Sequence, residues 1–262
     1  MPELGQPLRI AWIGHSTVLI ETEGARILTD PLLRSRIAHV RRVTEEPPAI
    51  GGELDAVLLS HVHHDHLDFP SLGLVRARRI VVPPGAGRLL ERRGFQNVVE
   101  LEEGHELSVG SVTVCATHAE HDARRWPYGT VVPALGYLIG GSAQLYFAGD
   151  TDLFEGMVEL GLGLDVALLP IDGWGPRVGP GHLDPRRAAE ALRLLTPRVA
   201  VPIHWGTYRR IGLHGDVARL RERAELFRRL AAELAPEVDV RILMPGERLE
   251  LPLAASAGEA RC

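Results

Sequence analysis

His61-Val62-His63-His64-Asp65-His66 is the stretch that decides the fold of this 262-residue chain. It follows residues 55–60 (DAVLLS), an apolar run that is typical of a buried strand. Four possible metal ligands in the pattern H-x-H-x-D-H therefore lie on a loop that leaves a strand, where a rigid scaffold can fix them as a metal site requires. The pattern predicts a metal-dependent hydrolase.

The spacing within this loop predicts two groups of ligands. His61 and His63 are two residues apart, so on an extended segment their side chains face the same side and can bind one ion. Asp65 and His66 follow where the chain must turn, and they can face a second ion. Neutral imidazole and carboxylate groups suit zinc, with manganese and iron as alternatives. A polar loop with ordinary surface histidines is the competing interpretation, and this density of ligand types disfavours it.

Three further candidate ligands also follow apolar, strand-like runs. They are His121 after residues 112–116, Asp150 after residues 145–149, and His204 after residues 199–203. A carboxylate at position 150 could bridge two cations, while Gly149 allows the backbone to turn tightly. Taken singly, Asp150 could instead cap a helix and His204 could be a core histidine. Their shared position after strands favours a joint site with the loop ligands.

The remaining pattern predicts strands first and a strand–helix alternation afterwards. Short strands are expected at residues 8–13, 17–21, 26–29, 79–82, 98–101, 106–109, 134–139, 143–148, 166–169, 198–202 and 238–243. Helices are expected at residues 87–93, 153–160, 184–195 and 216–234, and residues 34–52 as a loop bordering the site. This order predicts two sheets with helices outside them, in one domain over residues 1–262, with a disordered tail at 254–262.

Composition excludes several classes of protein. The formal net charge of -5 gives no electrostatic case for a nucleic-acid partner. No run reaches the roughly 18 apolar residues that a bilayer crossing needs, so no membrane insertion is expected. The first residues resemble no secretory signal. Two cysteines, Cys115 and Cys262, make a disulfide framework unlikely and fit a reducing cytoplasm, which is the predicted location.

The order of these motifs resembles the metallo-β-lactamase superfamily. H-x-H-x-D-H is followed by a further histidine, then Gly149-Asp150, then His204-Trp205-Gly206-Thr207. Flanking motifs narrow the resemblance to the branch with N-acyl-phosphatidylethanolamine phospholipase D and ascorbate-6-phosphate lactonase. Those motifs are residues 12–17 (WIGHST), 29–31 (TDP), 119–121 (AEH), 181–185 (GHLDP) and 202–207 (PIHWGT). The resemblance covers about residues 8 to 208.

The resemblance implies a four-layer αβ/βα sandwich with two metal ions along one edge. By motif, the first ion would be held by His61, His63 and His121. The second would be held by Asp65, His66 and His204, with Asp150 between the two ions. His118 is the alternative to His121, although the Ala-x-His context fits His121 better. Asp122 stands where the phospholipase carries an aromatic residue, so lipid specificity does not transfer.

Two zinc ions would generate a hydroxide nucleophile at neutral pH and polarise the attacked oxygen. Asp65 is then expected to orient the nucleophile, and His182 to protonate a leaving group or stabilise developing charge, because its family counterpart lies near the substrate. His182 could also be a packing residue of its loop. His15 is expected to line the pocket floor or support a ligand. Arg124 and Arg125 could reach an anionic substrate, or could simply be solvated.

The predicted activity is hydrolysis of a small phosphorylated substrate, first of all a phosphodiester. A lactonase acting on a phosphorylated sugar lactone is the nearest alternative. A non-catalytic metal-binding scaffold is the alternative of another class, and the complete ligand set disfavours it. Di-iron redox relatives of the fold carry a Glu in place of the second motif histidine, whereas His63 is present here. The substrate, the metal and the oligomeric state are not fixed by the sequence.

Overall fold

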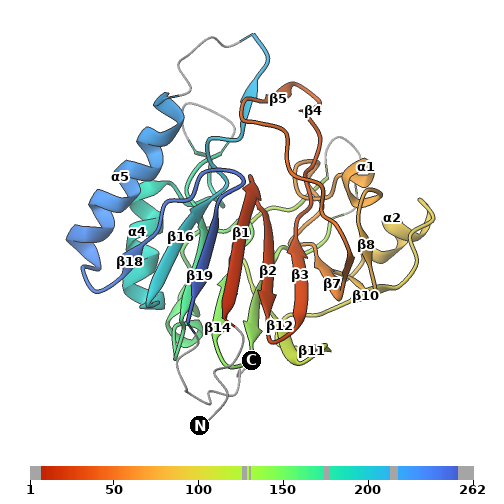
Figure 1. Cartoon of the computed structure of the whole chain (residues 1–262), viewed down its shortest axis with the longest axis horizontal. Helices are drawn as coiled ribbons and strands as arrows, with labels where there is room; N and C mark the ends of the chain where they lie inside the picture. The colour runs from red at the N-terminus through yellow and green to blue at the C-terminus, as the bar shows by residue number, and fades with distance from the viewer. Residues whose placement is uncertain (1–6, 126–128, 130, 174–177, 213–217, 253–262) are drawn as a thin grey trace.

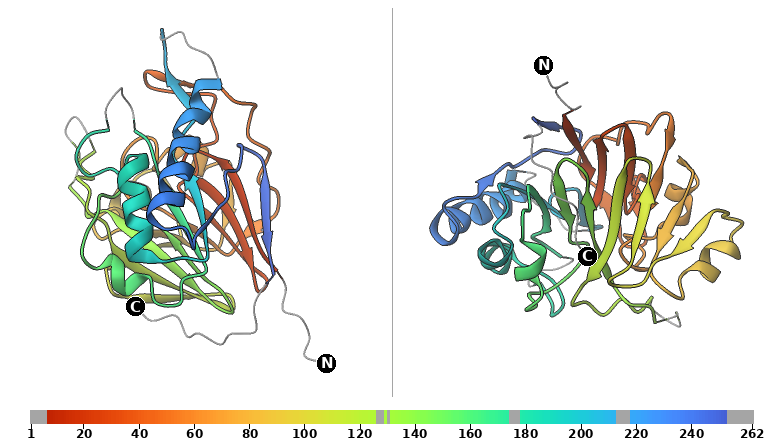
Figure 2. Two further views of the ribbon diagram at one scale, coloured as in Figure 1. Left: turned by 90° about the vertical axis from the view of Figure 1, so that its left-hand side faces the viewer. Right: turned by 90° about the horizontal axis from the view of Figure 1, so that it is seen from below.

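Two seven-stranded β-sheets pack face to face in the computed structural model, and helices cover the outer face of each (Figure 1). The structure describes residues 7–125, 129, 131–173, 178–212 and 218–252. Seen from below, the two sheets form the middle layers and the helices lie on the outside (Figure 2). This is the four-layer sandwich that the sequence predicts.

The first sheet has the strand order β10-β9-β7-β3-β2-β1-β19. Its strands are β1 (Leu8–Gly14), β2 (Thr17–Thr22), β3 (Ala25–Thr29), β7 (Ala56–Leu58), β9 (Ile80–Val82), β10 (Val98–Glu100) and β19 (Arg248–Leu251). Strands β1 to β3 form an antiparallel meander, and β7 joins β3 in parallel. Helices α1 (Phe69–Leu72) and α2 (Gly87–Glu91) cover its outer face. The end of β7 therefore delivers the histidine loop to the same edge as the end of β3.

The second sheet has the order β11-β12-β13-β14-β15-β16-β18. Its strands are β11 (Glu106–Val109), β12 (Val112–His118), β13 (Leu135–Gly140), β14 (Gln144–Phe147), β15 (Val166–Pro170), β16 (Val199–Ile203) and β18 (Asp239–Val240). Its helices are α3 (Met157–Leu160), α4 (Pro185–Leu195) and α5 (Ala218–Leu234). Because β14, β15 and β16 are parallel, their carboxyl ends meet at one edge of the sheet.

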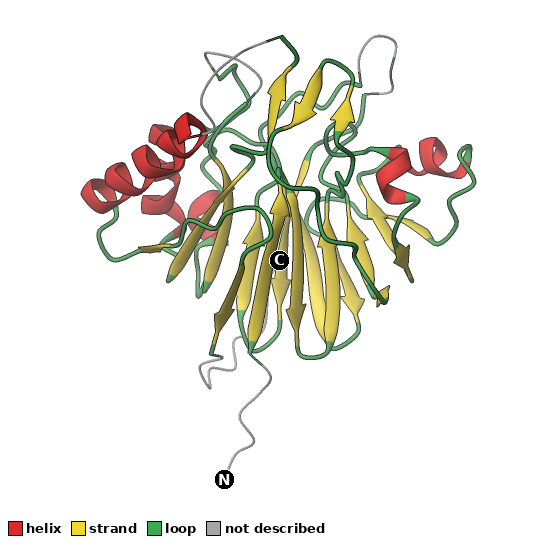
Figure 3. Ribbon diagram, turned by 45° about the horizontal axis from the view of Figure 1, so that its top comes forward, coloured by secondary structure: helices red, strands yellow, loops and turns green. Residues whose placement is uncertain are grey.

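Most strands are buried on both faces, which explains their continuous apolar runs. In β2, Val18 and Ile20 face the core between the sheets, while Leu19 packs under the helices of the first sheet. Ala224 and Phe227 of α5 are fully buried against the second sheet, so this helix packs on the core and its charged face is its outer face. Helices thus flank the strands on both sides (Figure 3).

Two small sheets add to this frame. Residues 34–52, expected as a loop, contain β4 (Arg36–Ile37) and β5 (Val40–Arg42), which pair with β17 (Tyr208–Arg210). The second small sheet pairs β6 (Glu53–Leu54) with β8 (Arg76–Ala77).

Cys115 is buried on β12. The other cysteine of the sequence, Cys262, and the tail at 254–262 lie outside the described residues. None of the described helices has the length and apolar composition that a bilayer crossing requires.

Candidate metal centre

The histidine loop is held in a tight turn directly after β7. The backbone N–H groups of His66 and Leu67 donate to the His63 carbonyl, at 3.1 and 2.8 Å. The Arg125 guanidinium donates to the carbonyls of Val62 and Leu67. Arg125 therefore fastens the loop from outside, and its position beside backbone carbonyls explains its burial better than a role with substrate.

The first group of ligands consists of His61, His63 and His121. Their ring nitrogens converge: His63 Nδ1 lies 3.0 Å from His61 Nε2 and 3.2 Å from His121 Nε2. Two nitrogens bound to one tetrahedral zinc lie about 3.3 Å apart when each Zn–N bond is about 2.0–2.1 Å. The distances from His63 Nδ1 to the other two nitrogens thus already match the spacing within a single coordination shell.

The second group consists of Asp65, His66 and His204, which lie close to Asp150. His66 Nε2 and His204 Nε2 are each 3.7 Å from Asp65 Oδ2. Asp150 presents one oxygen to each histidine, with Oδ2 3.2 Å from His66 and Oδ1 3.4 Å from His204. Asp150 also groups with His61 and with His121, so its carboxylate lies between the two sets of ligands.

Hydrogen bonds select which nitrogen of each histidine faces the other ligands. His66 Nδ1 lies 2.8 Å from Asp30, His121 Nδ1 2.7 Å from the Gly181 carbonyl, and His204 Nδ1 3.0 Å from the Asp172 carbonyl. Since these oxygens accept, the Nδ1 atoms carry hydrogen and the Nε2 atoms are left as ligands.

For His61 and His63, too, a hydrogen bond at one ring nitrogen leaves the other nitrogen as the ligand. The Ser60 hydroxyl donates to Asp30, so its oxygen is left to accept from His61 Nδ1 at 3.0 Å. His63 is reversed: its Nε2 donates to the Arg124 carbonyl at 3.2 Å, which leaves Nδ1. That is the same nitrogen that meets His61 and His121.

Asp30 is a residue whose role the sequence reasoning missed. It is fully buried and accepts hydrogen bonds from the Ser60 backbone, the Ser60 hydroxyl and His66. The motif Thr29-Asp30-Pro31 is the available signal, but in the sequence it indicates only the branch of the superfamily. Asp30 connects two histidines of the loop, His66 directly and His61 through Ser60.

Several site residues have left-handed backbone conformations. The φ angles of His15, Asp30 and His204 are +55°, +31° and +61°. Such angles are uncommon for residues with a Cβ atom and cluster at functional sites. All three follow directly after a strand or start a turn, so the strain lies where the chain turns a side chain towards the site.

Burial sets the protonation of the first group. It lowers the pKa of His61 and His63, and it lowers that of His121 to about 4. These imidazoles are therefore neutral at pH 7, which is the form that binds a metal.

The second group behaves differently because it contains carboxylates. Burial opposes a charged His66, but Asp150, Asp65 and Asp30 outweigh it and raise the pKa of His66 well above 6.5. Burial also opposes a charged Asp150, yet His204 and His66 lower the pKa of Asp150 well below its usual range. The carboxylates and histidines of this group therefore stabilise each other's charged forms in the metal-free protein.

The residues fit divalent cations on two independent grounds. His66 Nε2 and Asp150 Oδ1 are buried and make no hydrogen bond of normal geometry among the described residues. Buried polar atoms of this kind normally have a partner, and a cation would supply one. The donor set of imidazoles and carboxylates suits zinc, manganese or iron.

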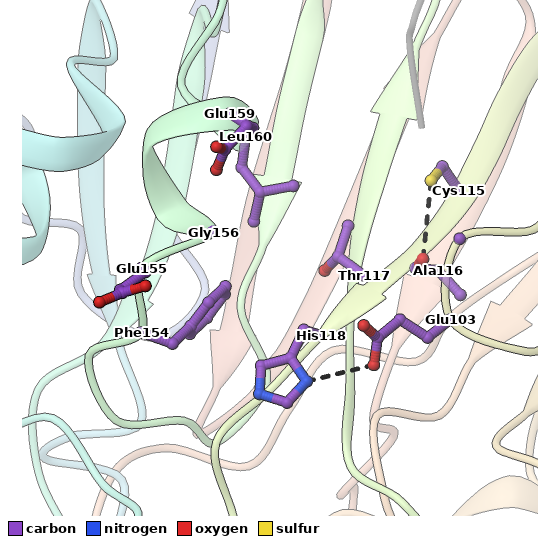
Figure 4. A pocket seen from close by; sticks show the side chains of 11 residues that line it. Glu103, Cys115, Ala116, Thr117, His118, Phe154, Glu155, Gly156, Glu159 and Leu160 are labelled. Carbon is purple, nitrogen blue, oxygen red and sulfur yellow. Dashed lines mark hydrogen bonds and ion pairs between the residues drawn. The ribbon is translucent and has the colours of Figure 1, made fainter.

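The structure separates His118 from His121. His118 is partly exposed and pairs with Glu103 at 3.1 Å and with Glu120 at 3.5 Å. Its ring lines a separate cavity of about 520 Å³ beside Phe154 and α3 (Figure 4). Of the two candidates, only His121 meets His63.

The other predicted residues lie at the rim of the site or behind it. His182 is partly exposed, and its Nε2 lies 3.5 Å from Asp150 Oδ2. Arg124 contributes its carbonyl to His63, and Arg125 contacts His64 Nδ1 at 2.9 Å. His15 lies behind Asp65, with His15 Nε2 3.0 Å from Asp65 Oδ2.

The comparisons with known proteins agree on one family. The model of the beta-lactamase superfamily domain matches residues 25–205. An uncharacterised protein of Mycobacterium tuberculosis is 31% identical, over 93% of this chain and 68% of the relative. A metal-dependent hydrolase of Caldivirga maquilingensis is 31% identical, over 93% of this chain and 98% of the relative.

Among solved structures, a metallo hydrolase from the archaeon Ignicoccus hospitalis is similar to this chain. It has a TM-score of 0.70 and 25% sequence identity, covering 94% of this chain and 99% of that one.

Proposed function

The chain belongs to the beta-lactamase superfamily, and from that premise we propose that it is a two-ion hydrolase of phosphodiesters. It is a metal-dependent hydrolase; the number of ions and the substrate are the steps that we add. The observation that carries the two-ion proposal is Asp150, whose two oxygens face different histidines between the two groups of ligands.

In this proposal His61, His63 and His121 would hold the first ion, Asp65, His66 and His204 would hold the second, and Asp150 would be shared by the two groups. When bound, two zinc ions lower the pKa of water and polarise the attacked oxygen. Asp65 orients the attacking water and receives its proton, because its carboxylate faces the space between His66 and His204.

His182 is proposed to deliver a proton to the leaving oxygen. Its Nδ1 donates to the Pro180 carbonyl at 3.2 Å, which leaves Nε2 directed at Asp150, 3.5 Å from Oδ2. A proton on Nε2 would thus face a leaving group bound there. The phosphodiester itself is proposed from the motifs that resemble the phospholipase branch. The cytoplasmic location also stays a proposal, which cell fractionation would test.

The test is hydrolysis of bis(p-nitrophenyl) phosphate by zinc-loaded protein. We expect turnover that Asp65→Asn and His182→Gln reduce by about 10²–10⁴-fold, the usual contribution of general acid–base catalysis. His105→Ala is the matched control, because His105 is an exposed histidine that lies away from the ligand groups. Turnover of a phosphorylated lactone without turnover of the phosphodiester would instead support the lactonase. Full activity of Asp65→Asn would remove Asp65 from the mechanism.

A further inference from the structure

His15 lies behind the second group of ligands and touches two of its members. It occupies the turn between β1 and β2 and is 3% exposed. We propose that His15 is a positioning residue that holds Asp65 and His204 together and so builds the binding site of the second ion. This inference rests on the proposed two-ion centre.

The side chain of His15 fixes Asp65. An ionised carboxylate can only accept hydrogen bonds, so the contact of 3.0 Å requires the hydrogen on His15 Nε2. A nitrogen that carries hydrogen has no lone pair for a cation. His15 therefore acts through Asp65 and is not itself a ligand, although it lies within 4.8 Å of the donor atoms of this group.

The main chain of His15 fixes His204. The His15 carbonyl accepts from the backbone N–H of His204 at 2.9 Å, and the centroids of the two imidazole rings lie 3.9 Å apart. Asp65 follows β7 in the first sheet and His204 follows β16 in the second. One residue thus connects ligands that arrive from different sheets.

The conformation of His15 is itself held by surrounding groups. Its backbone N–H donates to the Thr207 hydroxyl at 2.8 Å, and its carbonyl also accepts from the Trp12 indole at 2.8 Å. These bonds oppose the strain of a φ angle of +55°. His15 is thus hydrogen-bonded through its backbone N–H, its carbonyl and its ring. A residue fixed in this way is suited to hold Asp65 in one position.

The test is a titration of metal-free protein with zinc, with bound ions counted after dialysis. We expect wild type to bind two ions, and His15→Ala to keep the first while its affinity for the second falls by about 10–100-fold, as for other residues that support a ligand. His15→Gln should recover most of that affinity, because its side-chain amide can donate to Asp65. Ala and Gln carry the same left-handed strain, so the pair isolates the hydrogen bond.

Thermal melts of the metal-free variants separate this role from folding. Metal-free His15→Gln and His15→Ala should both melt cooperatively, and His105→Ala should match wild type in both affinities. If wild type binds two ions and His15→Ala keeps the wild-type affinity for the second, the positioning role of His15 is overturned. The two-ion centre itself would still stand. Equal losses in Ala and Gln would also overturn it, since the donor would then be irrelevant. A single ion in wild type would overturn the two-ion centre and this inference together.

Discussion

Gly149 has no Cβ atom, so the backbone after β14 can approach the ligand loop closely. Its φ angle is +61°, and a Cβ atom there would lie 2.6 Å from Ser60 Cβ and 3.0 Å from the Leu135 carbonyl. We predict that Gly149→Ala destabilises the protein by about 1–3 kcal/mol through overpacking, beyond the strain of the left-handed backbone. Urea unfolding of the metal-free protein measures this loss. Gly24→Ala is the control, because Gly24 has φ +81° and nothing within 4 Å of the added atom. Equal losses at both positions would show that the contact with Ser60 is unimportant.

Asp30 is the residue through which the ligand loop depends on β3. Its carboxylate holds His66 and, through Ser60, His61. We predict that Asp30→Asn weakens zinc binding by about 10–100-fold, because the amide cannot accept on both oxygen positions and no longer balances His66. Competition with a chromophoric chelator gives the affinities. Zinc affinity equal to that of wild type would mean that the fold alone aligns these histidines.

At the scale of secondary-structure elements, α4 tests whether an N-cap residue stabilises its helix as the sequence indicates. Asp184 accepts from the backbone N–H groups of Arg186 and Arg187, and Pro185 opens the helix. We predict that Asp184→Ala costs about 1 kcal/mol of unfolding free energy, the usual value of an N-cap. Asp184→Asn keeps an acceptor oxygen and should cost less in the same urea titration. If Asp184→Asn loses as much as Asp184→Ala, charge rather than the cap hydrogen bond is responsible.

Elements with local signals are predictable from the sequence, whereas those set by distant partners are not. The cap and proline of α4 place its bounds at Pro185–Leu195, as expected. By contrast, the sequence pattern predicts no strand at β19, whose partner β1 lies some 240 residues away along the chain. The helix expected at residues 153–160 is shorter in the structure, where α3 begins at Met157. The segment directly after Asp150 is bound to the site, because the Thr151 hydroxyl accepts from the Glu120 backbone near His121.

The same distinction holds for the ligands. H-x-H-x-D-H is a local pattern, and the strand ends before Asp150 and His204 are visible in the sequence. The hydrogen-bond partners that select the ligand nitrogen of each histidine are not visible in the sequence. Asp30 and Gly181 lie far along the chain from the histidines they hold, and no periodicity reports such a contact.

At the scale of the whole molecule, the candidate centre joins the two sheets. The loop after β7 supplies ligands from the first sheet, while His121, Asp150 and His204 come from the second. A cation bound there would cross-link both halves and would have no such site in the unfolded chain. We predict that zinc at 100 times its Kd stabilises the fold by about 2.7 kcal/mol per site, and that a chelator reverses this. Thermal melting with zinc or with a chelator measures the effect. A melting temperature that changes neither with zinc nor with the chelator would contradict metal binding in the folded state.

This stabilisation should depend on pH with a definite sign. The carboxylates around His66 outweigh its burial and raise its pKa well above 6.5, so the metal-free protein keeps a proton on His66 at neutral pH. That proton contributes stability that is fully present below the unfolded pKa of about 6.5 and is lost as pH rises through the folded pKa. Zinc must displace the same proton, so its effect grows over the same range. The gap between zinc-loaded and metal-free melting temperatures should therefore widen from pH 6 to pH 9, measured at constant free zinc. A gap that stays constant or narrows would mean that no ligand loses a proton when zinc binds.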